Sequence, residues 1–440
     1  MYNRKSVRLI SVLLLIVFAF SLSLGVFAEG DEEKTTEPAT EQSTEQQAVG
    51  TKEEKIPAAQ QVMDEFNNPD GRILCVSKQG DVSNYPENSW QGIKSAIKKG
   101  ADIIEIDVSK TSDGYLVLLK DEDFSRMCVD PAGNTITSKV SETESWEVIA
   151  MCLRQGRGGD AAEPTEYHPQ TLEAIIKAVG DKAVLMLDFD KEILDDVYEE
   201  VASLGAFDRV IFKFDSKAGA VKKFLSAHED TKIAVMGTYN GNVVFSARSY
   251  IKKMQKYEAE AVMLGVKNPN AVIFDKSVLK LFKDDLRAAI DLTDPKKCGE
   301  REDNENGWND LLGRGYSIIV TDYPDKLSTY IKGYENEKTA LETLLEKAKA
   351  LDLTKYGYKT SKTLEKETEN TEALLSTHTS KLNINEQYSR LNKAILSLDA
   401  ADGSTNGRTV TAGRVIAVIF VVILFAAVQF IIYKHSIKVK

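Results

Sequence analysis

Two carboxylates near the end of a buried apolar run are the residues best placed for chemistry in this chain. Glu105 and Asp107 stand two positions apart within residues 102–108, so both side chains point to the same side of a β-strand. A later apolar run ends in Asp188, and Asp190 follows two positions on. Buried like charges repel, so such a group needs a nearby cation or a bound proton. Oxygen ligands from Glu105, Asp107 and Asp188 suit Mg²⁺ or Ca²⁺, while pairing with lysines or capping of loops is the alternative.

Short apolar runs rich in β-branched residues recur through residues 67–333 and alternate with helical patterns. They cover residues 73–76, 102–108, 115–119, 184–189, 210–214, 232–236, 261–264 and 317–321, with a further candidate at 287–290. Strands that are apolar on both faces indicate parallel pairing with helices on both sides. The pattern predicts an α/β fold of the (β/α)8 TIM-barrel type, in which polar residues at the C-terminal strand ends meet the ligand. An open doubly wound sheet is the alternative.

The order of several short motifs resembles that of the glycerophosphodiester phosphodiesterase family. The stretch "NYPENSWQGIKSAIKKGADIIEIDVSKTSDGYLVLLKDEDFSR" is similar to the family's PENT, GAD-x-IE-x-DV, T-x-DG and HD elements. The segments "HPQTLEAI", "LMLDFDK" and "LLGRGYSIIVTDYPDKL" resemble later family segments, in the family's order between residues 72 and 331. The resemblance implies a TIM barrel, hydrolysis of phosphoric diesters in lipid or teichoic-acid metabolism, and metal ligands at Glu105, Asp107 and Asp188.

The functional positions of that family carry over only in part. The resemblance implies substrate-binding roles for Gln79, Glu87, Asn88, Arg126 and Asp190. The family's two catalytic histidines, however, fall on Lys78 and Lys120, its phosphate-binding arginine falls on Gln79, and a usual lysine falls on Asp190. A histidine with a pKa of about 6.5 can both accept and donate a proton near neutrality. A lysine with a reference pKa of about 10.4 is neutral in only about four molecules per ten thousand at pH 7.

We therefore interpret the chain as a pseudoenzyme that binds a phosphodiester or another surface ligand without turnover. On this hypothesis Lys78 and Lys120 supply the positive charge that a metal supplies in active relatives, and they pair with the three carboxylates. Loss of either partner of such a pair destabilises a protein, so Lys120→Ala should weaken the barrel. No cofactor is expected, with Ca²⁺ or Mg²⁺ as the alternative if the carboxylate site is retained. An active phosphodiesterase with altered catalytic residues and a purely structural display module are the other two hypotheses.

Both ends of the chain predict export and attachment to a membrane. Residues 1–28 combine cations, an apolar run and small residues before position 29, as in a cleaved signal peptide; an uncleaved anchor is the alternative. Residues 415–433 contain Gln429 as the only strongly polar residue and span about 28 Å as a helix, so we predict a transmembrane helix over 414–433. The basic tail 434–440 favours a cytoplasmic end. The prediction is a single-pass cell-membrane protein with most of the chain outside and a cell-wall or glycerophosphodiester ligand.

The remaining segments connect these parts. Residues 29–66 are interpreted as a disordered polar spacer, richest in Glu, Thr and Gln up to residue 57, and residues 400–413 as a linker. Residues 335–399 hold three stretches with helical apolar spacing, which predicts a small three-helix bundle. The strings "AKALDLTKYGYKTSKTLEKE" and "NEQYSRLNKAILSL" also resemble FIVAR-type modules, which implies a spacer or glycan-associated role on a Gram-positive surface.

Composition limits the partners and the covalent chemistry. The net charge of −11 argues against nucleic acid as a partner and against a broad basic surface for anionic lipid. Of the four cysteines, Cys128 and Cys152 are close in sequence and flank a loop-like stretch, so we favour a disulfide between them. Cys75 lies within a predicted strand and is interpreted as a buried thiol, and His168 as a surface histidine in a loop.

Overall fold

The computed structural model describes residues 58–399, except residues 216, 242, 267, 269, 283–285 and 378. Eight parallel strands of this part form a closed barrel. They are β1 (Leu74–Lys78), β2 (Ile103–Lys110), β6 (Val184–Phe189), β7 (Val210–Phe214), β8 (Ala234–Asn240), β9 (Ala261–Gly265), β10 (Arg287–Asp291) and β11 (Ile318–Thr321). Each strand pairs with the next, and β1 pairs with both β2 and β11, which closes the ring. The predicted TIM-type barrel is confirmed, and the open sheet is excluded.

The prediction of a barrel strand at residues 115–119 was wrong, and the further candidate at 287–290 is the strand that completes the barrel. Within residues 115–119 the strand β3 (Leu116–Val117) pairs antiparallel with the end of β2 and is not part of the ring. The candidate at 287–290 is β10, which pairs in parallel with β9 and β11. Its apolar run is only three residues long and has Arg287 before it and Asp291 after it. Such a short run carries little sequence signal of a buried strand.

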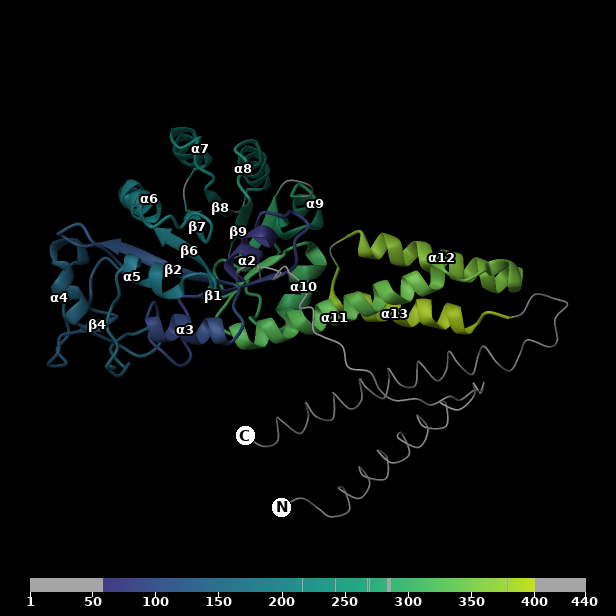
Figure 1. Ribbon diagram of the computed structural model, residues 1–440, viewed down its shortest axis with the longest axis horizontal. Coiled ribbons are helices and arrows are strands. Elements are labelled where there is room, and N and C mark those ends of the chain that lie inside the picture. Colours follow the sequence, from purple (N-terminus) through teal and green to yellow (C-terminus); the bar gives the residue numbers. More distant parts are fainter. Residues whose placement is uncertain are drawn as a thin grey trace, which may run out of the picture. The chain divides into compact units, whose positions relative to one another are not determined.

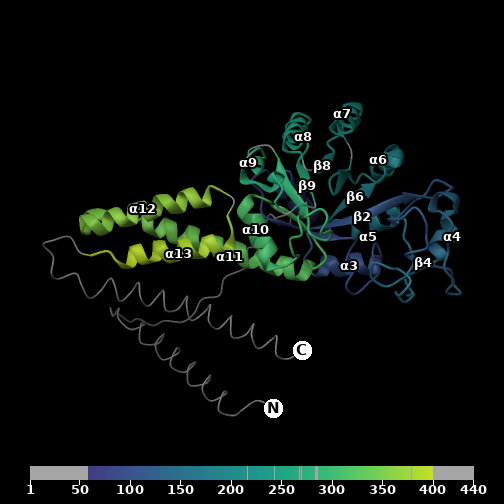
Figure 2. The same ribbon diagram turned by 180° about the vertical axis from the view of Figure 1, so that it is seen from behind.

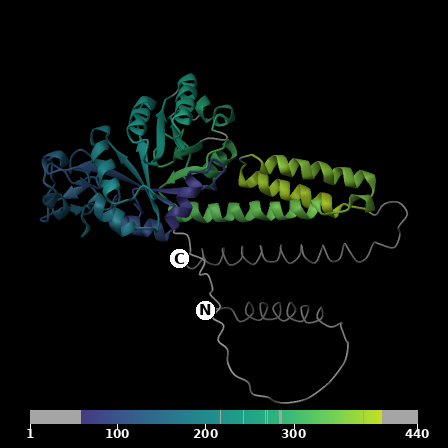
Figure 3. The same ribbon diagram turned by 45° about the horizontal axis from the view of Figure 1, so that its top comes forward.

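Helices cover the outside of the barrel, as Figures 1 and 3 show. They are α3 (Trp90–Lys98), α5 (Leu172–Val179), α6 (Leu194–Ser203), α7 (Ala218–Ala227), α8 (Val244–Lys256), α9 (Lys276–Leu279), α10 (Glu305–Arg314) and α11 (Pro324–Lys349), with 3₁₀ turns at Lys191–Ile193 (η2) and Val272–Phe274 (η3). The side chains of Ser89, Thr171 and Asn304 accept hydrogen bonds from the first turns of α3, α5 and α10, which fixes where these helices begin. Their apolar stripes pack against the outward faces of the strands.

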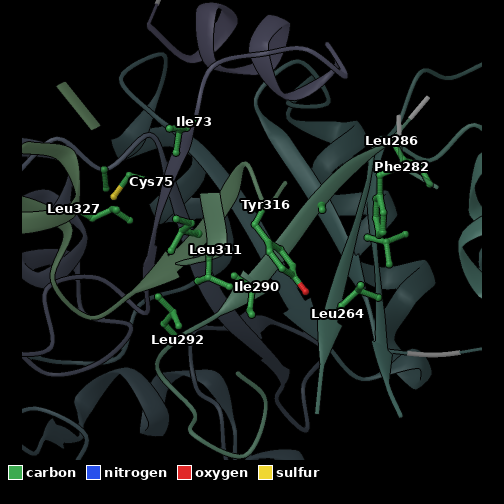
Figure 4. Packing of buried hydrophobic residues seen from close by; sticks show 14 of the residues in the cluster. Ile73, Cys75, Leu264, Phe282, Leu286, Ile290, Leu292, Leu311, Tyr316 and Leu327 are labelled. Carbon is green, nitrogen blue, oxygen red and sulfur yellow. The ribbon is translucent and has the colours of Figure 1, made fainter. Parts of the chain in front are cut away.

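Cys75 belongs to this outer core. Figure 4 shows it beside Leu327, in the same cluster as Ile290 and Tyr316. The side chain is fully buried, and burial raises the pKa of the Cys75 thiol well above its usual value. The structure thus confirms the prediction of a buried thiol at this position.

The inside of the barrel is filled in layers, because alternate residues of every strand point inward. The apolar inward residues are Leu74, Val76, Ile103, Val184, Met186, Ile211, Ala234, Met236, Ala261, Met263, Ala289, Ile318 and Val320. Two positions further along five of these strands stand Lys78, Glu105, Asp188, Lys213 and Asp291. The same alternation that fills the barrel with apolar side chains therefore brings five charged side chains together towards its C-terminal end.

Helix α2 (Ala58–Phe66) closes the opposite end of the barrel. Its buried residues Ala59, Val62, Met63 and Phe66 belong to the inner apolar cluster. This spacing places all four on one face of a helix, so the interpretation of residues 29–66 as a disordered spacer was wrong for residues 58–66. Gln and Glu residues in the same stretch conceal that stripe in the composition. The predicted signal peptide 1–28 and spacer residues 29–57 lie outside the described residues.

An excursion of about sixty residues between β2 and β6 builds a small core of its own. It contains η1 (Val140–Glu142), α4 (Ser145–Ala150) and a two-stranded sheet of β4 (Cys128–Val129) and β5 (Cys152–Leu153). Cys128 lies opposite Leu153, and Cys152 lies opposite Val129. Because opposite residues share a face and neighbours alternate, the two thiols point to opposite faces. The favoured disulfide is therefore wrong, and all four cysteines are free.

The last barrel helix continues into a three-helix bundle. Helix α11 (Pro324–Lys349) packs against α12 (Tyr358–Leu375) and α13 (Lys381–Leu396), with the short turn η4 (Leu353–Lys355) between α11 and α12 (Figures 1 and 2). The predicted helical content of residues 335–399 is confirmed, but the predicted boundary at 335 falls within α11. In the part of the chain with described coordinates, none of the helices combines the length and apolar character needed to cross a membrane. The predicted linker 400–413, transmembrane helix 414–433 and tail 434–440 lie outside that part.

A partly buried carboxylate before β9 gives the fold a pH dependence. The Oε2 atom of Glu260 accepts a hydrogen bond from the backbone N–H of Val235 at 2.7 Å, and burial raises the pKa of Glu260 to about 7. The stabilising effect of the protonated group is fully present below its unfolded pKa of 4.5 and is lost as the pH rises through about 7. We predict that Glu260→Gln raises the Tm by about 2–4 °C at pH 8 and leaves it unchanged at pH 4. Scanning calorimetry at both pH values checks this, and an equal gain at both would contradict it.

Candidate active site

Five charged side chains at the C-terminal end of the barrel form one continuous series of contacts, here called the ion-pair chain. The Nζ atom of Lys78 lies 2.6 Å from Glu105 Oε1 and 2.9 Å from Asp291 Oδ2. The Nζ atom of Lys213 lies 2.9 Å from the same Glu105 oxygen and 2.7 Å from Asp188 Oδ2. Asp188 is partly exposed, and the other four side chains are buried. Two ammonium groups therefore alternate with three carboxylates.

The ion-pair chain keeps its two lysines and two aspartates charged. Burial lowers the pKa of Lys78, but the attraction of Glu105 and Asp291 outweighs it and raises that pKa well above 10.5. For Lys213, burial likewise lowers the pKa, and Glu105 and Asp188 raise it to a net value above 10.5. Burial raises the pKa of Asp291 and of Asp188, but the neighbouring lysines lower both below 3.8. Both lysines are therefore ammonium ions throughout the neutral pH range.

Asp107 belongs to a neighbouring network of amide side chains. Its Oδ2 atom accepts hydrogen bonds from Asn88 Nδ2 at 2.9 Å and from the amide of Gln79, and its backbone N–H donates to Asn88 Oδ1 at 3.1 Å. Gln79 and Asn88 both have left-handed backbone conformations, with φ of 59° and 58°. Burial, followed by repulsion from Asp188, raises the pKa of Asp107. The sharp turns at Gln79 and Asn88 thus serve to hold one carboxylate.

Two arginines from the excursion after β2 approach this network. Arg126 lies 2.5 Å from the buried Glu87 through its Nη2 atom, and it also pairs with Asp121. Arg157 pairs with Asp322, donates to the side-chain oxygen of Gln79, and lies 3.8 Å from Glu87 Oε2. The two guanidinium groups therefore share Glu87 as a counter-charge.

Sequence reasoning did not predict Arg157. It lies between Gly156 and Gly158, and the left-handed φ of 66° at Gly158 lets the backbone pass directly against that of Arg126. This run of glycines around one arginine is the signal that could have identified it.

Most of the predicted site residues come together. Lys78, Gln79, Glu87, Asn88, Glu105, Asp107, Arg126 and Asp188 all belong to the contacts described above. Lys120 and Asp190 do not, because both side chains are exposed to solvent. The hypothesis that Lys120 closes the ion pairs is therefore wrong; Lys213 holds that position, and Asp291 is an additional carboxylate. A single lysine at an inward position of the apolar run of β7 was the available signal for Lys213.

No histidine with described coordinates lies at this site. His168 is exposed, and its Nδ1 atom lies 2.7 Å from the backbone oxygen of Met151, which agrees with the predicted surface position. His228 follows α7 and stacks on the ring of Tyr198, with 3.7 Å between the ring centroids.

A closed barrel with charged groups at the C-terminal strand ends is the architecture of TIM-barrel enzymes and their relatives. Residues 79–326 match the model of the glycerophosphoryl diester phosphodiesterase family, and the chain belongs to this family. It is 44% identical over 268 residues to a glycerophosphodiester phosphodiesterase of Bacillus altitudinis, covering 56% of this chain and 94% of that protein. A match at 44% identity over 55 residues to the Caldanaerobacter subterraneus glycerophosphodiester phosphodiesterase covers 12% of this chain and 23% of that protein.

A solved structure shows the same fold. The glycerophosphoryl diester phosphodiesterase from Parabacteroides distasonis superposes with a TM-score of 0.50 at 19% identity, covering 63% of this chain and 93% of that one.

A divalent cation does not fit between Glu105, Asp107 and Asp188 in this chain. The ammonium of Lys213 lies within 2.9 Å of both Glu105 and Asp188, and that of Lys78 lies 2.6 Å from Glu105. Two positive charges at these distances would repel a metal ion strongly. Among the residues with described coordinates, no group of three or more His, Cys, Asp or Glu side chains is arranged to hold a metal. Glu105 and Asp188 are therefore already neutralised by ammonium groups.

Proposed function

We propose that this protein is a catalytically silent member of its family, a pseudoenzyme whose barrel binds a ligand without cleaving it. Hydrolysis of a phosphodiester by acid–base catalysis needs one group that accepts a proton and another that donates one. Lys78 and Lys213 stay protonated at neutral pH because each is bound to two carboxylates. An ammonium ion can donate a proton but cannot accept one. The ion-pair chain is the single observation that carries this proposal.

The partly exposed arginines are the groups that we propose for ligand binding. The side chains of Arg126 and Arg157 are 31% and 37% exposed, and guanidinium groups suit phosphate and carboxylate oxygens. Each already has a carboxylate partner, Asp121 or Asp322, in addition to the shared Glu87. A phosphodiester or another anionic surface ligand must compete with these partners. We therefore expect weak, salt-sensitive binding.

The proposal includes a place for the barrel outside the cell. The apolar pattern of residues 414–433 and the leader-like pattern of residues 1–28 support export and attachment by a C-terminal helix. The helices α11, α12 and α13 then stand between the barrel and that anchor in the order of the chain. Their FIVAR-like strings support a spacer on a Gram-positive surface.

Release of glycerol phosphate tests the proposal directly. We predict that the purified protein, incubated with glycerophosphocholine or glycerophosphoethanolamine and with Ca²⁺ or Mg²⁺, gives no release above the rate without protein. The Bacillus altitudinis relative serves as the positive control under the same conditions. Metal-dependent release that disappears in Lys78→Met would instead establish an active phosphodiesterase with altered catalytic residues.

A further inference from the structure

We propose that the ammonium of Lys213 is a built-in substitute for a bound divalent cation, so that neutralising this one side chain creates a metal site. The inference rests on the proposed function, because it concerns what the same carboxylates hold in a barrel that does not turn over substrate. It goes further by assigning the role of the metal ion to Lys213 on β7, a residue outside the motifs that resemble the family. It also predicts a binding activity that the native protein does not have.

The position of Lys213 is the first support. Its Nζ atom lies 2.9 Å from Glu105 on β2 and 2.7 Å from Asp188 on β6, and β7 is the next strand in the barrel. Asp107 pairs in register with Asp188, which places a third carboxylate beside the same two strands. The oxygens of Glu105 and Asp188 that contact the Lys213 nitrogen are thus close to each other. After only small side-chain movements, the same two oxygens can bind one Ca²⁺ at about 2.3–2.6 Å.

Unpartnered oxygen atoms on β2 and β8, the latter strand next to β7, are the second and independent support. Glu105 is fully buried, yet its Oε2 atom has no hydrogen-bond partner among the described residues. Thr238 stands two positions after the inward-facing Met236 on β8, and its buried Oγ1 atom is also without a partner in the described part of the chain. Buried oxygens without partners are unfavourable, and both are ligands of the hard kind that Ca²⁺ takes. The site therefore retains an unused oxygen ligand at Glu105, and β8 carries a second unused oxygen at Thr238.

Charge decides which ion occupies the centre. In the native chain, two ammonium groups face Glu105, Asp107, Asp188 and Asp291. The substitution Lys213→Met removes one of these ammonium groups and leaves Lys78 as the only cation within the ion-pair chain. The remaining negative charge then favours a divalent cation. We expect Ca²⁺ to bind better than Mg²⁺, because Ca²⁺ tolerates irregular coordination whereas Mg²⁺ requires a near-octahedral site.

Titration of the chelator-treated full-length protein with CaCl₂ tests the inference by calorimetry and thermal unfolding. The native protein should release no binding heat, and its Tm should not move. Lys213→Met should have a lower Tm in EDTA, bind Ca²⁺, and gain about 5 °C at a Ca²⁺ concentration of about 100 times its Kd. Lys120→Met removes an exposed lysine by the same substitution and should behave like the native protein.

Each other outcome contradicts the inference. Folded Lys213→Met without Ca²⁺ binding, or native protein that binds Ca²⁺ at least as tightly as the variant, would overturn it. If Lys213→Met does not fold in EDTA, refolding from urea with Ca²⁺ should restore its near-UV circular dichroism; failure in both buffers also overturns it. Release of glycerol phosphate by the native protein would contradict the proposed function, but the Lys213→Met variant could still bind Ca²⁺. Failure of the proposed function and failure of this inference are therefore distinguishable.

Discussion

Replacing Lys78 by methionine should lower the free energy of unfolding by about 3–5 kcal/mol, because it removes one side of a buried ion pair. Lys78 lies between Glu105 and Asp291, and both carboxylates are at most 1% exposed. Without the ammonium, the hydrogen bonds that Asp291 keeps with described residues come from the backbone and hydroxyl of Thr293, at 2.9 and 2.6 Å. Glu105 keeps Lys213. Most of the loss in the free energy of unfolding should therefore come from the buried, unpaired charge of Asp291.

Urea unfolding followed by tryptophan fluorescence measures this effect in the barrel itself. All three tryptophans, Trp90, Trp146 and Trp308, precede α11, so the signal does not report on α12 and α13. The double variant Lys78→Met/Asp291→Asn keeps an acceptor for Thr293 and removes both charges. It should recover about half or more of the lost stability, since replacement of a whole buried pair by neutral groups is often tolerated.

Lys120→Met is the matched control, because it makes the same substitution at a lysine outside the ion-pair chain. Its side chain is exposed, so the free energy of unfolding should change by no more than about 0.5 kcal/mol. Equal losses for Lys78→Met and Lys120→Met would show that the ion-pair chain does not stabilise the barrel in the way described.

The contrast between Lys78 and Lys120 shows what the sequence could predict about this site. Lys78, Glu105 and Asp188 lie on strands whose apolar runs are plain in the sequence, and strand alternation then determines that their side chains face inward. Lys120 follows β3, and that strand's antiparallel pairing with β2 takes the segment outside the ring. The exposure of Lys120 therefore depends on a strand pairing that the local sequence pattern does not specify.

Lys213 and Asp291 could not be predicted as partners from local sequence. Lys213 is 108 residues from Glu105, and Asp291 is 213 residues from Lys78. Their meeting depends on the register of β7 against β6 and of β10 against β11, which only the closed barrel determines. Arg157 depends likewise on the path of a loop within the excursion. Strand ends are thus predictable from sequence, whereas contacts across the barrel require its closure.

The opposite end of the barrel contains a further buried cation, with a different kind of partner. Arg287 begins β10 and is 1% exposed, and its hydrogen bonds to the described residues all go to neutral oxygens. Its guanidinium donates to the backbone oxygens of Glu65, Gly71, Arg72 and Ser317 and to the hydroxyl of Ser317. Burial lowers the pKa of Arg287 to about 10, so it stays charged at neutral pH. This one side chain connects the C-terminal end of α2, the start of β1 and the start of β11.

Arg287→Met should lower the free energy of unfolding by about 3–5 kcal/mol, because four backbone carbonyl groups and one hydroxyl lose a charged donor at once. The loss should be largest at α2, whose last turn contributes the Glu65 oxygen and whose apolar face closes the inner core. Hydrogen exchange of residues 58–66 should therefore become faster than exchange of β6 and β7.

Arg72→Met is the control for the Arg287 prediction. Arg72 pairs with Asp102 through Nη2 at 2.7 Å but is 36% exposed, so its removal should lower the free energy of unfolding by no more than about 1 kcal/mol. If Arg287→Met left the exchange of α2 unchanged, attachment of that helix would depend on its apolar face alone. Faster exchange confined to residues 58–66 would instead show that a single buried arginine couples the helix before the barrel to the start of β1 and β11, because its guanidinium bonds the backbone of all three segments.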